Sequence, residues 1–332
     1  MEYSKKQVNK AGEVLKNSIH DKSISTDEIN GAMQILSHWR SRHVLPLLRA
    51  YQLVKRYTDK IGNNAIYGQR LKRTRSIMYK LNRMEGGLSR LQDIGGCRVI
   101  LSTTAQLFRL YDLLKDSKSI LPNHKNYLLE PKSDGYRSIH LIYQSSSKDV
   151  LHDKLKIEIQ LRTKLQHSWA TAVEIIDTFN HEKLKIGQGS ELWQRFFYLL
   201  ADEFALLEKL PVHSNHENRR AEIRQLASEL NIIEKMNNYN LLSKNIEVDK
   251  KIRKKYLVLW LNPVDKRLNV FSFGNEQSSQ ELYLSLEQTQ KDKRDEVVMV
   301  HAESLSQLKK SYPNYFADSK LFIENLNNIL KE

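Results

Sequence analysis

Polar and apolar residues alternate without a break over residues 154–162. Side chains of a β-strand point to opposite faces with a period of two, so this pattern predicts a strand whose leucines and isoleucines pack on a core. The opposite face of that strand then carries, in one row, Lys154, Lys156, Glu158, Gln160 and Arg162. The solvent-facing strand of an antiparallel sheet would show the same pattern, so the row alone does not establish a site.

The same periodicities predict the other elements of the chain. The sequence Ser25-Thr26-Asp27-Glu28 is typical of a capping box that opens a helix, which Pro46 should bend or divide. Helical spacing predicts further helices over 69–84, 104–115 and 163–179, two between 192 and 233, and others near 277–290 and 318–330. Extended segments predict strands over 96–101, 127–129, 136–143, 154–162, 256–261, 268–273 and 296–301.

These elements predict an α+β protein. We divide the chain into a helical N-terminal extension (1–44), a mixed α/β core (45–182), a helical segment (183–250) and a small α+β C-terminal module (251–332). A charged linker over residues 249–255 leads into that module. The sequence shows no internal repeat and no low-complexity tract, and the C-terminal module carries no constellation of residues that indicates catalysis.

Composition narrows the class of protein. The 332 residues are 40% hydrophobic and 28% charged, which is typical of a folded chain with a core. No apolar run approaches the roughly 20 residues that a membrane helix needs, and the N-terminus lacks a secretion signal, so we expect a cytoplasmic protein without membrane contact. The single cysteine, Cys97, excludes intramolecular disulfides and Cys-rich zinc sites.

The net charge of +14 favours a polyanionic partner. Much of the excess lies between Arg40 and Arg98, where 14 Lys or Arg stand against three acids. A solvated helix face is the usual explanation of such a run. The cluster is densest just before a predicted strand, however, and this position indicates phosphate binding by Arg70, Lys72, Arg73, Arg75, Lys80 and Arg83.

Two further segments carry candidate chemistry. In residues 131–140, Tyr136 follows a turn glycine and lies near Lys132, so a nucleobase could stack on the ring while the lysine meets a phosphate; ordinary packing is the alternative. His140 shares the face of Tyr136 and could equally be structural. Asp93 directly precedes a glycine pair and a strand, where a carboxylate can hold Mg²⁺. Together with Glu158 it would supply the two carboxylates that phosphoryl-type transfer requires.

Residues 70–80, 93–98, 131–140 and 158–163 occur in the order and at the spacing typical of the RelA/SpoT family, and this central part of the chain resembles the family's alarmone, or (p)ppGpp, synthetase domain. The resemblance covers about residues 45–180. It implies a nucleotidyltransferase-like mixed sheet flanked by helices, of the small stand-alone synthetase type. It further implies transfer of pyrophosphate from ATP to the 3′-hydroxyl of GDP or GTP, giving (p)ppGpp and AMP.

The resemblance also implies roles for individual residues. Asp93 would bind Mg²⁺, and Glu158 would act on the acceptor hydroxyl as a base or through the metal. The ATP phosphates would be held by Arg70, Lys72, Ser76 and Lys80, with help from Arg98. The acceptor nucleotide would be held by Lys132, Tyr136, His140, Gln160 and Arg162.

Two departures from the family pattern matter. Asp134 stands where the family often has Asn, and its charge beside the acceptor leaves the identity of that acceptor open. Large relatives carry an upstream hydrolase with a His-Asp metal site, whereas here the segment before the synthetase is short and His20-Asp21 is its only such pair, so we expect no hydrolase activity.

Other functions stay open on the sequence alone. Small relatives that act as toxins suggest pyrophosphate transfer to the 3′ end of tRNA, or synthesis of adenosine alarmones. A catalytically silent nucleic-acid-binding module would keep the basic face but lose the metal carboxylates, and Asp93 and Glu158 argue against it. The sequence leaves open the role of residues 183–332, a homo-oligomeric state and any effector.

Overall fold

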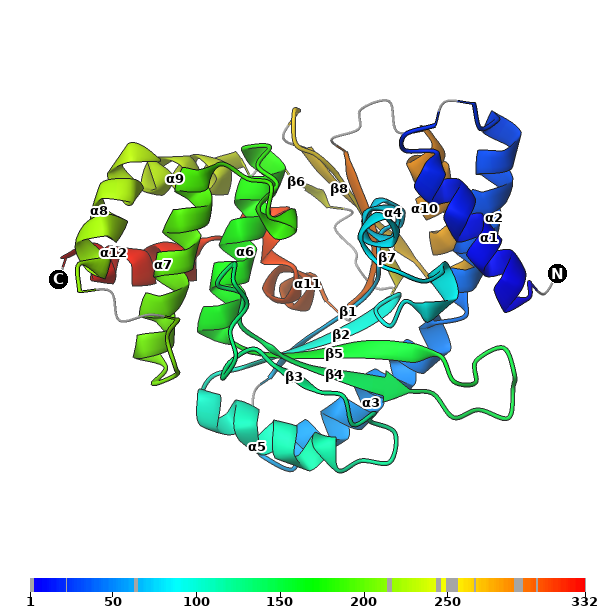
Figure 1. Cartoon of the computed structure of the whole chain (residues 1–332), viewed down its shortest axis with the longest axis horizontal. Helices are drawn as coiled ribbons and strands as arrows, with labels where there is room; N and C mark the ends of the chain where they lie inside the picture. The colour runs from blue at the N-terminus through cyan, green and yellow to red at the C-terminus, as the bar shows by residue number, and fades with distance from the viewer. Residues whose placement is uncertain are drawn as a thin grey trace.

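The computed structural model describes residues 3–21, 23–62, 65–213, 217–242, 246–248, 256–265, 267–289, 295–302 and 304–331. Within these residues one mixed sheet of nine strands, in the order β3-β4-β5-β2-β1-β9-β7-β8-β6, runs through the molecule and is flanked by helices (Figure 1). The predicted α+β fold with a mixed sheet is therefore confirmed. No helix in the described part of the chain combines the length and the apolar character needed to cross a bilayer.

The half of the sheet from β3 to β1 carries the predicted site residues. We call it the central half because its strands come from the central segment of the chain. Its strands are β1 (Ile66–Leu71), β2 (Gly95–Leu101), β3 (Lys125–Asn126), β4 (Ile139–Gln144) and β5 (Lys156–Thr163). β2 and β5 pair in parallel and place Gly96 opposite Glu158 and Arg98 opposite Gln160. β4 pairs antiparallel with β5 and brings His140 opposite Gln160. The apolar residues of β5 are fully buried from Ile157 to Leu161, so its polar row faces away from that core, as predicted.

Two predicted elements are wrong in part. The helix expected over 69–84 begins only at Thr74 as α4 (Thr74–Arg83), because residues 66–71 form β1 between β2 and β9. Pairing on both sides of this strand overrides the local helical spacing. The strand expected over 127–129 is a turn, in which the Asn126 side chain accepts a hydrogen bond from the Leu128 N–H, and the short strand β3 precedes it.

The N-terminal helices pack beside the sheet. They are α1 (Lys5–Asn17), α2 (Thr26–Ser41) and α3 (Val44–Asp59). Ser25 caps α2 by accepting the Glu28 N–H at 3.2 Å, as predicted. Pro46 lies in the first turn of α3, where its missing N–H would have had no partner within the helix. The predicted helix is divided just before it, between Ser41 and Val44. α1 and α2 share a core with α4 that includes Leu15, Trp39 and Ile77.

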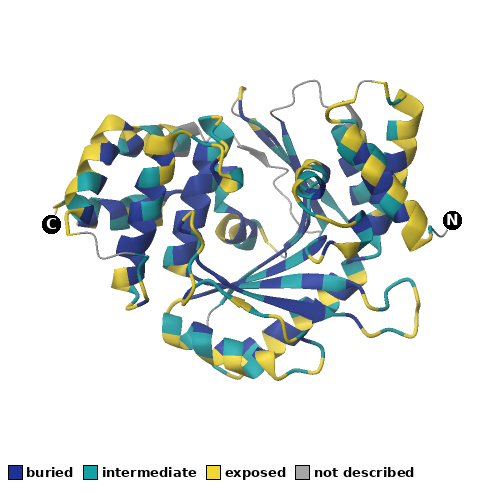
Figure 2. Cartoon of the chain, viewed as in Figure 1, coloured by how far each residue is buried: buried dark blue, intermediate teal, exposed yellow. Residues whose placement is uncertain are grey.

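Helices pack on one face of the central strands and flank the other face, which stays open to a cavity. α3 and α5 (Thr104–Lys115) pack under one face, with Leu107, Leu110 and Leu114 in the main core. On the other side, a second core joins α6 (Lys164–Phe179), α7 (Glu191–Leu207), α8 (Arg219–Glu229), α9 (Ile232–Leu242) and α12 (Lys320–Lys331). Figure 2 shows that α6 and α7 carry much of the buried surface in this layer. Short 3₁₀ turns are η1 (Leu88–Arg90), η2 (Leu184–Ile186) and η3 (Pro313–Phe316).

The C-terminal strands continue the same sheet. They are β6 (Ile246–Val248), β7 (Tyr256–Asn262), β8 (Arg267–Phe273) and β9 (Glu296–His301), with helices α10 (Glu276–Thr289) and α11 (Leu305–Ser311). β9 pairs with β1 through Gln69 opposite His301 and Arg70 opposite Val300. The α+β elements expected after residue 251 are thus present, and they extend the core sheet. The charged linker predicted over 249–255 lies outside the described residues.

Candidate active site

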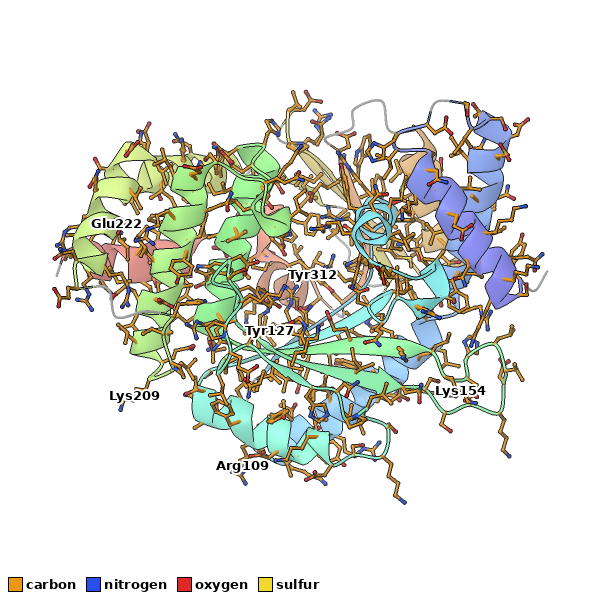
Figure 3. All side chains as sticks on the ribbon, in the orientation of Figure 1. Arg109, Tyr127, Lys154, Lys209, Glu222 and Tyr312 are labelled. Atoms are coloured by element: carbon orange, nitrogen blue, oxygen red, sulfur yellow. The ribbon has the colours of Figure 1, made fainter. Side chains whose placement is uncertain are left out.

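All twelve residues predicted for the site line one cavity of about 1310 Å³. The cavity lies between the polar face of the central strands, α4 and the layer of α6 and α7. Figure 3 labels two further lining residues, Tyr127 and Tyr312, in the middle of the molecule. The lining includes twelve Lys or Arg and only five acids. Such a surface favours a ligand with several negative charges.

Asp93 organises one end of the cavity, which we call the donor side. It sits just before β2, and its Oδ2 accepts hydrogen bonds from Lys72 Nζ at 3.0 Å and from Lys80 Nζ at 2.7 Å. Burial raises the pKa of Asp93, but the two lysines outweigh burial and hold that pKa below its ordinary value. Asp93 Oδ1 is buried and has no hydrogen-bond partner among the described residues. The carboxylate is therefore ionised and keeps one oxygen for a ligand.

Glu158 lies farther along the sheet, opposite Gly96 of β2, and organises what we call the acceptor side. Its Oε1 lies 3.2 Å from His140 Nδ1, and its Oε2 accepts a hydrogen bond from Gln160 Nε2 at 2.6 Å. His140 Nε2 lies 2.8 Å from the Tyr136 hydroxyl, which in turn accepts a hydrogen bond from Arg162 at 2.6 Å. Side chains from β4, β5 and the loop before β4 thus form one continuous hydrogen-bonded chain.

Charges within this chain shift three pKa values. Burial raises the pKa of Glu158, but the hydrogen bond and charge of His140 outweigh it and hold the carboxyl pKa well below its ordinary value. Burial lowers the pKa of His140, but Tyr136 and Glu158 raise it by more, so the pKa lies above its ordinary value. Burial raises the pKa of Tyr136, but Arg162 and His140 lower it to about 8. Glu158 is therefore an ionised acceptor beside a histidine that favours its protonated form.

Cations cluster further along β2 and β5, past Glu158. Gln160 Oε1 accepts hydrogen bonds from Arg162 at 3.2 Å and from Arg98 at 3.4 Å. Burial and the neighbouring charges of Arg162 and Arg70 lower the pKa of Arg98 to about 10. Such mutual repulsion is relieved when an anion binds among the guanidinium groups. Arg70 and Ser76 also line the cavity.

Aromatic rings and one lysine form the wall of the acceptor side. Lys132 Nζ lies 5.4 Å from the ring centroids of both Tyr127 and Tyr136, and the Arg162 guanidinium lies 4.9 Å from the Tyr136 ring. These are cation–π contacts. A nucleobase that stacks on Tyr136 would have to share or replace them. Asp134 Oδ1 accepts the Tyr136 N–H at 2.9 Å, which an Asn could do equally, so the departure from the family pattern keeps this local bond.

Sequence reasoning missed several lining residues. Glu174 of α6 is half-buried, pairs with Lys185 at 2.9 Å and acts electrostatically on Arg98 and Arg70. A lone acid inside the apolar run 172–176 was the available signal. Tyr127, Tyr198 and Tyr312 also line the cavity, and they come from segments whose apolar spacing indicates only packing.

The donor set fits Mg²⁺ better than a metal with many protein ligands. Among the described residues, no group of three or more His, Cys, Asp or Glu could hold a metal ion. Mg²⁺ commonly uses one or two carboxylates and completes its shell with water and phosphate oxygens. The free Oδ1 of Asp93 suits this role. Both oxygens of Glu158 already contact protein groups, and its charge raises the pKa of Asp93, so the two carboxylates share one electrostatic environment.

Comparison with known proteins supports the resemblance. The chain is 32% identical over 83 residues to the GTP pyrophosphokinase YwaC of Bacillus subtilis, covering 24% of this chain and 40% of that protein. It is 28% identical over 129 residues to the GTP pyrophosphokinase YjbM of the same organism, covering 37% and 61%. The GTP pyrophosphokinase rsh of Brucella ovis is 31% identical over 107 residues, covering 32% of this chain and 14% of that protein. The chain thus spans less than two thirds of each of these relatives.

A solved structure and a family model complete the comparison. The small alarmone synthetase 1 of Bacillus subtilis, bound to its product pppGpp, overlaps 54% of this chain and 94% of its own, at 21% identity and a TM-score of 0.44. That overlap is too loose to bear on function. Residues 69–178 match the family model described as the region found in RelA/SpoT proteins, and this segment contains the twelve residues predicted for the site. The central segment of the chain, residues 69–178, is therefore similar to the region found in RelA/SpoT proteins.

Proposed function

We propose that this protein transfers a pyrophosphoryl group from ATP to the 3′-hydroxyl of GDP or GTP, producing (p)ppGpp and AMP. The observation that carries the proposal is the convergence of four separated sequence segments on one strongly cationic cavity. The relatives of the central segment that are named GTP pyrophosphokinases support this choice of substrates.

On the donor side, the cavity would bind the triphosphate of ATP. Lys72 and Lys80 neutralise its charge, and Arg70, Ser76 and Arg98 line the same wall. Mg²⁺ would sit at the free oxygen of Asp93 and, when bound, supply further charge neutralisation on the phosphate oxygens. Positioning and electrostatic stabilisation account for most of the catalysis of phosphoryl-type transfer.

On the acceptor side, the guanine nucleotide would lie against Lys132 and Tyr136, with Arg162 and Gln160 beside it. Glu158, which is ionised, accepts a hydrogen bond from the 3′-hydroxyl and orients it, and because its pKa is lowered it takes the proton only as the oxygen bonds to the β-phosphorus of ATP. A bond forms between O3′ and the β-phosphorus, the bond from the β-phosphorus to the α–β bridging oxygen breaks, and AMP leaves with that oxygen. His140 holds Glu158 in place through the 3.2 Å contact.

Transfer to the 3′ end of tRNA competes with this proposal, because the same cationic cavity suits an RNA backbone. The decisive experiment incubates the purified chain with ATP labelled on the γ-phosphate and with GDP, GTP, ATP or total tRNA in turn. We expect label in the guanine nucleotide together with stoichiometric AMP. Label in tRNA or in an adenine nucleotide alone would overturn the assigned acceptor, and no label in any acceptor would overturn the transfer activity.

A further inference from the structure

Residues 132–137 form an irregular loop that carries Lys132 and Tyr136 into the cavity; we call it the acceptor loop. Its own hydrogen bonds are few: the Gly135 N–H donates to the Lys132 carbonyl at 2.9 Å, the Lys132 N–H donates to the Tyr136 carbonyl at 3.4 Å, and the Tyr136 N–H donates to Asp134. A loop of this kind needs outside contacts to hold two side chains in place for binding. Some of those contacts come from the matched segment itself: His140 and Arg162 contact the Tyr136 hydroxyl. Arg137 also donates to the Leu128 carbonyl at 3.2 Å. The others come from α7 and from the segment that follows it, which lie beyond the matched residues 69–178.

Asp202 of α7 makes the first group of contacts. Its carboxylate is 1% exposed and accepts a hydrogen bond from Arg137 Nη2, at the end of the loop, at 3.0 Å. The backbone N–H of His213 donates to both carboxylate oxygens at 3.2 Å, and His213 Nδ1 lies 2.7 Å from Oδ1. Arg219 Nη2 lies 3.9 Å from Oδ2. One buried carboxylate thus holds the loop, α8 and the segment after α7 together.

His213 reaches the loop from the other direction. Its Nε2 lies 2.8 Å from the carbonyl oxygen of Lys132, at the start of the loop. A carbonyl and a carboxylate oxygen both accept hydrogen bonds, so the ring makes both contacts at once when each ring nitrogen carries a hydrogen. The ring of His213 also packs on Tyr198 of α7, with 4.6 Å between ring centroids. Asp202 and His213 therefore make polar contacts to both ends of the acceptor loop: Asp202 to Arg137 and His213 to the Lys132 carbonyl.

The middle of the loop packs on the same helix. Gly135 has a φ of +86°, and a Cβ at this position would lie 2.8 Å from Ala201 Cβ and 3.3 Å from Tyr198 Cα. Only glycine allows this approach without moving the helix. The loop thus meets α7 at Gly135 and Arg137, and it meets the segment after α7 at Lys132.

We propose that Asp202 and His213 are positioning residues for the acceptor, because they fix the acceptor loop on α7 and so hold Lys132 and Tyr136 in the cavity. The inference rests on the proposed function for the identity of the acceptor. It assigns a role in acceptor binding to residues outside the matched segment.

The test uses the full chain and two variants of different severity. Asp202→Asn removes the negative charge and so weakens the hydrogen bonds of this side chain with Arg137 and His213. His213→Phe keeps a ring against Tyr198 and removes both hydrogen bonds of the imidazole. Hydrogen exchange of residues 131–137 is measured without nucleotide, and initial rates are measured with GDP and ATP varied in turn. We expect faster exchange of the loop in both variants and a KM for GDP raised by about tenfold or more, with the KM for ATP unchanged.

Glu203→Gln is the matched control. Glu203 is the neighbour of Asp202 on α7, is 3% exposed and pairs with Arg219 and Arg220. If α7 contributed only general stability, this variant would shift loop exchange and KM as Asp202→Asn does, and such a result would overturn the proposal. Unchanged loop exchange in His213→Phe would also overturn it. A wild-type chain that transfers nothing would defeat the proposed function instead, while the exchange measurement would still decide the positioning role.

Discussion

The two halves of the single sheet differ in how their faces are used. In the central half, β5 alternates strictly, and its polar row of Glu158, Gln160 and Arg162 opens into the cavity. In the C-terminal half, β7 and β9 are almost continuously apolar. Val258 and Met299 join the main core on one face, while Leu259 and Val298 join a separate core with η3 and α11 on the other.

This difference shows how the burial of a strand is reflected in its sequence pattern. A strand covered on both faces carries an unbroken apolar run, and a strand with one open face alternates. The alternating strand can therefore carry polar chemistry, whereas the continuous strands can only contribute packing. Where the halves meet, C-terminal groups contact the start of the donor side: Glu296 pairs with Arg73 at 2.8 Å, and Glu287 accepts a hydrogen bond from Thr74 at 2.6 Å.

Glu158→Gln should give the largest effect, because it removes the proton acceptor from the open face but keeps the side-chain shape. We expect kcat to fall by about 10²–10⁴-fold, the range of general acid–base catalysis, with the KM for both nucleotides nearly unchanged. Initial-rate kinetics provide the measurement. If this variant kept more than half of the wild-type kcat, Glu158 would not be the proton acceptor of the reaction.

Asp93→Asn should be slightly less severe and should act through the metal. We expect about 10²–10³-fold lower kcat, because an amide binds Mg²⁺ poorly and no longer neutralises Lys72 and Lys80. Electron paramagnetic resonance of added Mn²⁺ measures metal binding with ATP present, independently of turnover. Undiminished Mn²⁺ affinity in this variant would contradict the proposed metal site, and an unchanged melting temperature would show that the fold is retained.

Leu259→Ala tests the closed half of the sheet. The side chain is fully buried, so we expect the free energy of unfolding to fall by about 2–5 kcal/mol. Leu321→Ala, at a position that is 39% exposed, is the control and should change stability by less than about 0.5 kcal/mol. Urea unfolding gives both values. The KM values of the folded enzyme should not change, and a raised KM would show that the C-terminal half does more than pack.

The gathering of the candidate residues around one cavity was easier to predict from the sequence than the boundaries of the sheet. Each of the four motifs lies within a short segment, so their residue types and strand periodicity could be read locally. Residues 69–71 were assigned to a helix, not to a strand, because the pairing of β1 with β9, some 230 residues later in the chain, leaves no local trace. Asp202 and His213 were missed for the same reason, since an acid on a largely apolar helix and a histidine in a loop indicate a role only once Arg137 and Lys132 are seen beside them.

Glu296→Gln tests the contact between the two halves. Arg73 lines the cavity and loses its charged partner in this variant, so its position at the start of α4 is less well defined. We expect the KM for ATP to rise about two- to fivefold, in line with a partly exposed ion pair worth up to about 1 kcal/mol. Asp112→Asn, which breaks the exposed pair with Lys115, is the control and should leave the KM for ATP unchanged. Equal effects of the two variants would refute the coupling.

The smallest effect concerns pH and separates the acceptor side from the donor side. Because Arg162 and His140 lower the pKa of Tyr136 to about 8, the phenol gains a negative charge as pH rises through that value. The charge lies beside the site of an anionic nucleotide, so the KM for GDP should rise a few-fold between pH 7 and about 9, while the KM for ATP should change less. Tyr136→Phe cannot ionise and should lose this rise. A rise that persists in Tyr136→Phe would place the titrating group elsewhere, and an equal rise for ATP would show that the two ends of the cavity are not electrostatically distinct.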